Sequence, residues 1–285
     1  MFRLRMTGAL ARRWTLAAGV ALLATGCDDD STGPFAPEGR RIFGVDASNN
    51  LVQFGSANPG RARTTRITGT LGGESMVGID FRPADGRLYG VSSANRIYTV
   101  DTLTAVATPV GAAAFTPALV GTGFGVDFNP AADRIRLHAS EGQNLRLNQL
   151  TGATAATDTA LTYASGDAGF GVAPRIVATA YTNSVAGATS TSPTVLFAID
   201  SNRDVLTLVN PPNAGRMTTV GPLGVNTTED TGFDIFGPDS AREAYVSLTV
   251  GTRSELYTIN LANGTTSRVG RIGSELPLRG IAVAP

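Results

Sequence analysis

The sequence has 285 residues, of which 42% are hydrophobic and 34 are glycine, so it is long enough for one large β domain or two smaller domains. Its 23 basic residues are all Arg and balance 23 acidic residues, while His138 and Cys27 are each the only residue of their type. This composition argues against a zinc or copper site, which usually needs several His or Cys ligands. It also lacks the excess of positive charge that nucleic-acid binding requires.

Residues 1–26 are predicted to form a signal peptide. An Arg-rich start precedes an apolar segment, residues 14–26, that is too short to predict a transmembrane helix. The following Ala24-Thr25-Gly26-Cys27 resembles a bacterial lipobox, so we expect Cys27 to carry a lipid anchor. The alternative is a plain secretory signal with an incidental cysteine.

The residues after the signal predict a tether and a single domain. Residues 27–39 are polar and contain Gly, Pro and Asp, as in a flexible tether, and residues 40–285 are expected to form one domain. Removal of the signal leaves 19 Arg against 23 acidic residues, a net charge of −4, which again argues against a nucleic-acid partner.

The remaining chain predicts many short strands separated by turn residues. Three strands open it, at residues 41–45, 51–54 and 64–70. Four units of four strands follow, at residues 78–83, 87–91, 96–100 and 105–110; 125–130, 134–138, 144–147 and 153–157; 175–182, 194–199, 205–209 and 217–220; and 232–235, 243–248, 255–261 and 265–269. A last strand lies at residues 280–283.

The units are repeats of nearly even length. Gly78-Ile79-Asp80-Phe81 is echoed at Gly125–Phe128 and at Gly232–Ile235, and the equivalent positions on the first strands are Asp80, Asp127, Ala180, Asp234 and Ala282. Four strands per unit, with a C-terminal strand left over for the incomplete first unit, predict an all-β fold: a five-bladed β-propeller closed by the C-terminal strand pairing into the first blade. A β-sandwich or another blade number is the alternative.

Several motifs occur in a fixed order along these repeats. They are Gly125–Pro130, Asp133–Arg136, Gly142–Arg146, Ala180–Asn183, Pro211–Gly215 and Gly232–Ile235. Together they resemble the bacterial family called domain of unknown function 4394, over roughly residues 41–285. The resemblance implies a propeller-like, exported protein and assigns no activity.

The best candidate for a functional site is the set of repeated carboxylates Asp80, Asp127 and Asp234. If they lie on the innermost strands, they surround the central channel, where they could bind Ca²⁺ or act as acid and base in the hydrolysis of a glycoside. The alternative is structural, because a repeat tends to copy a structural role, such as accepting backbone N–H groups.

A second candidate is a donor-rich set in the third repeat, where Arg134 and Arg136 share one strand face and Arg146 lies on the next strand. Such a set could bind an anionic or sugar ligand. The alternative is an inter-blade network in which Asp127, Asp133 and Glu141 neutralise the Arg residues. We expect His138 at a strand end as an ordinary polar residue. The full set of candidates is Asn129, Arg134, Arg136, Gln143, Asn144 and Arg146.

The sequence therefore predicts an exported, lipid-anchored propeller in the bacterial cell envelope, in the periplasm or at the cell surface. Its expected role is a binding or scaffold module for a protein or glycan ligand, without an assigned catalytic residue. The alternative is a calcium-dependent or carboxylate-based enzyme that acts on carbohydrate.

Overall fold

The computed structural model describes residues 1–2, 35–189 and 191–285. The predicted signal peptide from residue 3 onward, the predicted lipid site Cys27 and most of the predicted tether lie outside the described residues. Within the described ranges, no helix has the length and apolar character needed to cross a bilayer.

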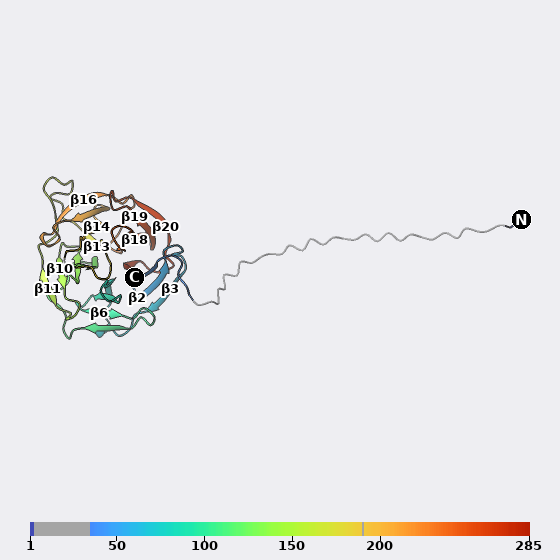
Figure 1. Ribbon diagram of the computed structural model, residues 1–285, viewed down its shortest axis with the longest axis horizontal. Helices are drawn as coiled ribbons and strands as arrows, with labels where there is room; N and C mark the ends of the chain where they lie inside the picture. The colour runs from blue at the N-terminus through green and yellow to red at the C-terminus, as the bar shows by residue number, and fades with distance from the viewer. Residues whose placement is uncertain (3–34, 190) are drawn as a thin grey trace. The chain divides into compact units, whose positions relative to one another are not determined.

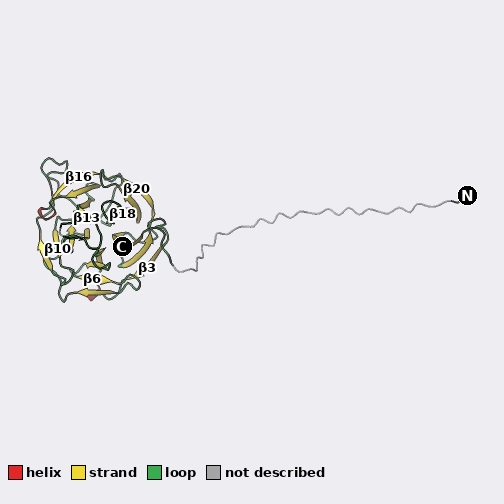
Figure 2. Ribbon diagram, viewed as in Figure 1, coloured by secondary structure: helices red, strands yellow, loops and turns green. Residues whose placement is uncertain are grey.

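The unit from residue 35 onward is a five-bladed β-propeller (Figures 1 and 2). Blade 1 comprises β21 (Leu278–Val283), β1 (Arg41–Asp46), β2 (Asn50–Gly55) and β3 (Ala62–Arg66); blade 2 comprises β4 (Met76–Phe81), β5 (Leu88–Ser92), β6 (Ile97–Val100) and β7 (Ala107–Val110). Blade 3 comprises β8 (Phe124–Asn129), β9 (Arg134–Ala139), β10 (Asn144–Leu147) and β11 (Thr154–Thr157). Blade 4 comprises β13 (Ile176–Tyr181), β14 (Leu196–Asp200), β15 (Val205–Val209), β16 (Arg216–Pro222) and β12 (Thr162–Tyr163); blade 5 comprises β17 (Gly232–Phe236), β18 (Glu243–Val250), β19 (Arg253–Ile259) and β20 (Thr266–Arg271).

The two ends of the propeller meet in blade 1, as predicted. The C-terminal strand β21 pairs antiparallel with β1, with Ala282 opposite Phe43, and so supplies the innermost strand that the N-terminal segment lacks. The C-terminus accordingly lies near the middle of the ring in Figure 1. This closure pairs the inner edge of β1, which would otherwise be free to pair with a strand of another chain.

Three details differ from the prediction. The third strand ends at Arg66 rather than residue 70, because Thr68 leaves blade 1 to form a parallel bridge with Val106 of the neighbouring blade. Strand β7 begins at Ala107, since Ala105 has a left-handed backbone with φ of 56°. The short strand β12, which sequence analysis missed, adds to the outer edge of blade 4 by pairing parallel with β16.

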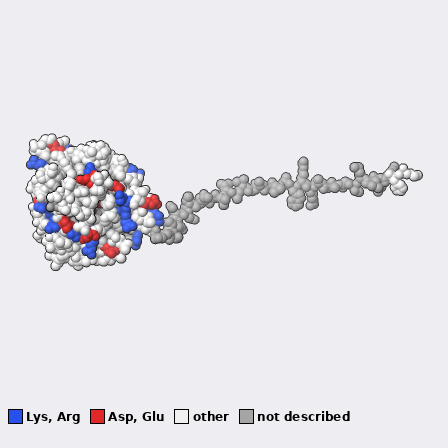
Figure 3. Space-filling model, in the orientation of Figure 1, with Lys and Arg blue, Asp and Glu red and all other residues white. Residues whose placement is uncertain are grey.

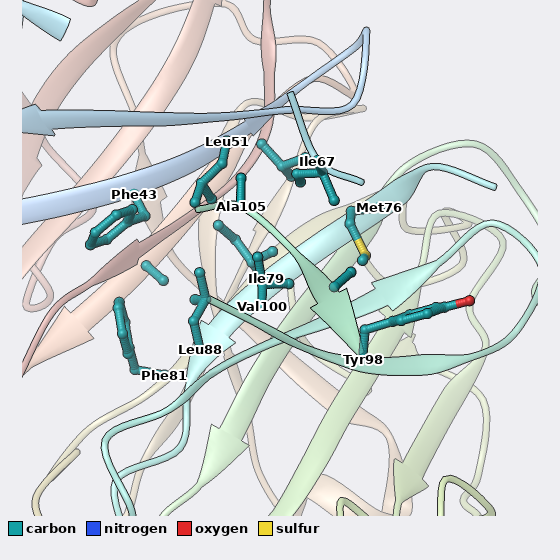
Figure 4. Close-up of a cluster of buried hydrophobic side chains, with 13 residues drawn as sticks. Phe43, Leu51, Ile67, Met76, Ile79, Phe81, Leu88, Tyr98, Val100 and Ala105 are labelled. Atoms are coloured by element: carbon teal, nitrogen blue, oxygen red, sulfur yellow. The ribbon is translucent and has the colours of Figure 1, made fainter. Parts of the chain in front are cut away.

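Apolar side chains from the facing surfaces of adjacent blades form the core. Figure 4 shows the cluster between blades 1 and 2, in which Phe43 and Leu51 of blade 1 pack near Ile79 and Leu88 of blade 2. Phe43 makes an edge-to-face contact with Phe81, with 5.7 Å between ring centroids. Packing of this kind between successive blades is what holds a propeller together, since each blade buries its faces only against its neighbours.

The inner strands approach one another too closely for side chains at two glycines. A Cβ on Gly125 would lie 2.7 Å from the backbone nitrogen of Thr179, and one on Gly232 would lie 2.5 Å from that of Ile281. The cavity that remains on the axis at this level is about 10 Å³, which is room for about one water molecule. The centre of the ring is therefore nearly closed.

Candidate functional site

The three repeated carboxylates meet at the axis of the propeller, as the alignment of repeats predicts. Asp80, Asp127 and Asp234 lie on the innermost strands β4, β8 and β17, and each offers an oxygen within 4.8 Å of the others. All three are buried, with 3–4% of each residue exposed. We call them the axial aspartates.

Each axial aspartate bonds to the inner strand of the following blade. The Asp80 carboxylate accepts the backbone N–H of Phe128 at 2.7 Å, and Asp127 accepts that of Tyr181 at 2.8 Å. Asp234 accepts the N–H of Val283 at 2.6 Å, which ties blade 5 to the C-terminal strand. In each case the donor directly follows the equivalent position of the next repeat.

Two repeats have alanine at this position, so they offer no carboxylate to accept the N–H of the following inner strand. Ala282 precedes Asp80 around the ring and cannot accept the N–H of Phe81, so Asp80 accepts it through its second oxygen at 2.7 Å. Burial raises the pKa of Asp234, and the backbone N–H of Ile235 partly offsets this rise. Three carboxylates thus accept the inward N–H groups of four inner strands, which is the structural role considered above as the alternative.

Burial and mutual repulsion favour protonation of the axial aspartates. Burial, followed by the charge of Asp234, raises the pKa of Asp80 well above its usual value. Burial, followed by the charges of Asp80 and Asp234, raises the pKa of Asp127 in the same way. Burial raises the pKa of Asp234 to about 6. A proton shared within the group relieves the repulsion between like charges at short range.

This donor set suits a structural role better than calcium binding or catalysis. Calcium takes six to eight oxygen ligands, whereas the groups facing these carboxylates include four backbone N–H donors, which stabilise negative charge and repel a cation. The three aspartates are also buried, so a sugar ring has no access to their carboxyl groups.

The second predicted site is a polar cluster between blades 3 and 4. Its centre is Arg136 on β9, whose residue is 2% exposed. The guanidinium donates to Asp158 at 2.6 Å, to Asn144 at 2.7 Å and to Asn213 at 2.8 Å. It also donates to the hydroxyl of Tyr181 at 3.2 Å. The polar cluster consists of Arg136, Asn144, Arg146, Asp158, Tyr181 and Asn213.

Asp158 is the counterion of the polar cluster. Arg146 stands directly opposite Arg136 in the β9–β10 ladder and donates to both carboxylate oxygens of Asp158, at 2.8 and 2.9 Å. Burial alone would raise the pKa of Asp158, but the hydrogen bonds and charges of Arg146 and Arg136 outweigh it and hold the pKa below its usual value. One carboxylate therefore compensates two guanidinium groups.

The expectation that Asp127, Asp133 and Glu141 neutralise these arginines was wrong. Asp127 faces the axis, Asp133 pairs with Arg82 of blade 2 at 2.6 Å, and Glu141 is exposed. Asp158 was not among the predicted site residues, because it lies in the loop after β11, where an aspartate resembles an ordinary turn residue. Asn213 lies in the Pro211–Gly215 motif, which was not among the candidate site residues.

Three other predicted site residues lie outside the polar cluster. Arg134 donates to the carbonyl of Asp133 at 2.7 Å, and the side chain of Gln143 donates to the carbonyl of Ala118 at 2.8 Å. The side-chain oxygen of Asn129 accepts the N–H groups of Ala131 and Ala132 in the β8–β9 turn. These residues hold loops in place, and only Arg136, Asn144 and Arg146 of the donor-rich set come together.

His138 lies near the end of strand β9, as expected, but it is not an ordinary polar residue there. It is fully buried on β9, and neither of its ring nitrogens has a hydrogen-bond partner among the described residues. Burial, followed by the nearby charge of Arg136, lowers the pKa of His138 to about 3. The imidazole is therefore neutral at physiological pH, because a second buried cation beside Arg136 would be strongly unfavourable.

The polar cluster fixes the segment that leads from blade 3 to blade 4. The side-chain amide of Asn144 donates to the carbonyls of Thr159 at 3.0 Å and Pro212 at 2.9 Å. The N–H of Thr159 in turn donates to the carbonyl of Asn213 at 3.2 Å. Residues 158–163, which include β12, are therefore held from both blades.

This segment forms one wall of a pocket of about 890 Å³, which we call the interblade pocket. Loop 170–175 forms another wall, and the β9–β10 and β14–β15 turns complete it. Its lining residues are Ser140, Glu141, Gly142, Ala160, Leu161, Thr162, Tyr163, Phe170, Gly171, Val172, Ala173, Pro174, Arg175 and Asn202. The volume lies at the upper end of the range for pockets that bind small organic ligands.

The far wall of the interblade pocket is anchored to blade 4. Asp167, just before loop 170–175, accepts the backbone N–H of Thr219 at 2.6 Å and that of Gly169 at 2.7 Å. Both long walls are thus fixed by buried or partly buried polar contacts.

Charged groups of both signs are interspersed on the face of the molecule shown in Figure 3.

Comparisons with known proteins identify a family and several similar solved structures. Residues 50–282 match the family described as "Domain of unknown function (DUF4394)". No protein of curated function matches the sequence. An auxiliary nutrient binding protein from Bacteroides ovatus is 13% identical over 72% of this chain and 55% of its own, with a TM-score of 0.41.

Two further solved structures are similar at the same level. A protein of unknown function from Bacteroides thetaiotaomicron is 13% identical over 86% of this chain and 64% of its own, with a TM-score of 0.46. YCF48 bound to D1 peptide is 12% identical over 80% of this chain and 77% of its own, with a TM-score of 0.38. The chain thus spans less than two thirds of the length of the two Bacteroides proteins.

Proposed function

The chain belongs to the DUF4394 family, and from this premise we propose that it is an exported, lipid-anchored propeller that binds a ligand in the interblade pocket. The family description names no activity, so the proposal rests on the geometry of the chain itself. Its ligand is a peptide or a glycan, and its role is binding or scaffolding rather than catalysis.

One observation carries the choice of site. The motifs that mark the family resemblance supply Arg136, Asn144, Arg146, Tyr181 and Asn213, and these residues converge on the segment that forms one wall of the interblade pocket. Burying a guanidinium costs free energy unless it is fully paired, so fixing a loop with a buried charged cluster costs more free energy than fixing it with apolar contacts. A wall held so firmly is preorganised, which reduces the entropy lost when a ligand binds.

Export and anchoring are proposed from the N-terminal residues. The Arg-rich start, the apolar segment and the lone Cys27 fit a lipoprotein signal, and a lipid on that cysteine would tether the propeller to a membrane outside the cytoplasm. A tethered propeller of this kind would present its loops, including the interblade pocket, to ligands in the periplasm or at the cell surface.

The alternative, a calcium-dependent or carboxylate-based enzyme for carbohydrate, would use the axial aspartates. Their backbone partners and their closed surroundings support the binding module instead. A calcium titration still separates the two proposals, since a bound ion would raise the melting temperature and Asp127→Asn would abolish that rise.

The proposed pocket is tested by filling it. Short peptides and oligosaccharides of glucose, mannose and N-acetylglucosamine are screened for a rise in melting temperature, because a ligand at 100 times its Kd stabilises the folded state by about 2.7 kcal/mol. Val172→Arg in the pocket should abolish the rise. Val269→Arg is the matched control, since both valines are exposed to a similar extent, 43% and 38%, and Val269 lies on β20 of blade 5.

A rise that survives Val172→Arg would place the ligand elsewhere and contradict the proposal. A rise abolished equally by both variants would show a general effect of added charge and would also contradict it. The absence of any rise across the screen counts against a peptide or glycan ligand.

A further inference from the structure

The interblade pocket has an unbalanced negative charge. Its lining includes two charged side chains, Glu141 and Arg175. Arg175 forms an ion pair with Glu229, so its charge is compensated. Glu141 is exposed in the β9–β10 turn, and it makes no ion pair or side-chain hydrogen bond within the described part of the chain. The pocket therefore offers one free carboxylate and no free cation.

The other surfaces of the pocket are apolar and partly aromatic. Phe170 is 63% exposed and Val172 is 43% exposed, which leaves both available for contact with a ligand. Leu161 and Tyr163 are buried and form the inner wall. The guanidinium of Arg203 lies 4.8 Å from the centre of the Tyr163 ring, so one aromatic ring of this wall already stacks with a cation from the chain itself.

We propose that the interblade pocket binds a peptide segment through a lysine or arginine side chain. The methylene groups of such a side chain would pack on Phe170 and Val172, and its charged end would pair with Glu141. Long basic side chains combine an apolar stem with a cationic head, which matches an apolar pocket that carries one carboxylate. An exposed aromatic ring adds a cation–π contribution. A volume of about 890 Å³ accommodates several residues rather than a single ammonium ion.

This inference rests on the proposed function, and it is tested with two peptides that differ in charge alone. Acetyl-Gly-Ala-Lys-Ala-Gly-amide and the same peptide with norleucine in place of lysine have nearly the same apolar stem. Ligand-detected NMR titration measures both dissociation constants at low ionic strength. We expect the lysine peptide to bind about fivefold more tightly, from one exposed ion pair and one cation–π contact. The preference should shrink as salt is added.

Variants of single residues assign the preference. Glu141→Gln should reduce the preference to the roughly twofold part that the cation–π contact supplies, whereas Glu38→Gln, which removes an exposed carboxylate outside the pocket, should leave the preference unchanged. Phe170→Leu keeps an apolar contact and should lower the preference about twofold through loss of the cation–π contact.

The outcomes separate this inference from the proposed function. Equal affinities for the two peptides in the unmodified protein, with binding abolished by Val172→Arg, would overturn the inference and leave the pocket in place. Binding of neither peptide, with a thermal shift from an oligosaccharide that Val172→Arg abolishes, would overturn the peptide as ligand. Binding of neither peptide and no oligosaccharide shift would overturn both proposals.

Discussion

Replacing Asp158 with asparagine tests whether one carboxylate supports the polar cluster. The substitution keeps the size of the side chain and removes the charge that compensates Arg136 and Arg146. Removing one partner of a buried ion pair costs about 3–5 kcal/mol. Arg136 keeps neutral acceptors in Asn144 and Asn213, and Arg146 is 35% exposed and can be hydrated. We therefore expect a loss of about 3 kcal/mol, at the lower end of that range.

The loss is measured by urea denaturation of the mature protein at neutral pH. The slope with urea should stay constant, since the surface exposed on unfolding does not change. Asp239→Asn is the matched control, because Asp239 pairs with Arg242 on the surface and such a pair contributes at most about 1 kcal/mol. A cost for Asp158→Asn no larger than that of Asp239→Asn would refute the assignment of the counterion.

A double substitution separates the charge from the packing. Arg136→Met combined with Asp158→Leu removes both buried charges, and hydrophobic replacement of a buried pair is often neutral or stabilising. We expect the double variant to be more stable than Asp158→Asn while its pocket wall loses its fixed position. Weaker ligand binding at restored stability would show that the polar cluster preorganises the interblade pocket.

Three further predictions concern the axis, the closure of the ring and the anchor. The folded-state pKa of Asp234 is raised to about 6, so protonation of Asp234 stabilises the folded state at low pH, and this stabilisation is lost as pH rises through 6. Asp234→Asn should therefore remove roughly 2–3 kcal/mol of the fall in unfolding free energy between pH 4 and 7. A pH profile of stability that Asp234→Asn leaves unchanged would contradict this prediction. Deleting residues 278–285 removes β21 together with the N–H of Val283 that Asp234 accepts, so thermal unfolding should lose its cooperativity. A cooperative transition at the original temperature would disprove closure of the ring. Cys27→Ser should move the protein from the membrane fraction to the soluble extracytoplasmic fraction, and membrane association that persists would rule out a lipid at that residue.

Repeats made the ring predictable from the sequence. The equivalent positions Asp80, Asp127 and Asp234 recur at nearly even spacing, and the structure places all three on innermost strands of successive or alternate blades. The unpaired C-terminal strand followed from counting strands, because four-stranded blades cannot otherwise be completed. The pairing of Ala282 with Phe43 confirms that prediction.

Contacts between distant segments that do not follow the repeat were not predictable. Strand β12 contains two residues, Thr162 and Tyr163, and pairs with a strand 54 residues later, so no local alternation marks it. Asp158 has its partners 12 and 22 residues earlier on two different strands. Its role depends on how the β9–β10 ladder places Arg136 opposite Arg146, which the sequence pattern does not specify.

The central channel expected from the sequence is nearly closed at the level of two inner-strand glycines. Gly125 and Gly232 lie where the backbone of the next blade leaves no room for a Cβ, so the strands close on the axis. The carboxylates beside them then bond to backbone N–H groups instead of lining an accessible channel. The sequence alone identifies the repeated aspartates, but their role as acceptors of backbone N–H groups follows from the short distance between adjacent inner strands.

Amide chemical-shift mapping of the lysine peptide on the isotope-labelled mature protein tests the binding site most directly. The account predicts that the shifted resonances belong to residues 140–142, 160–163 and 170–175, which together line the interblade pocket. Shifts that centre instead on Gly125 and Gly232 at the axis, or an unchanged spectrum at saturating peptide, would contradict it.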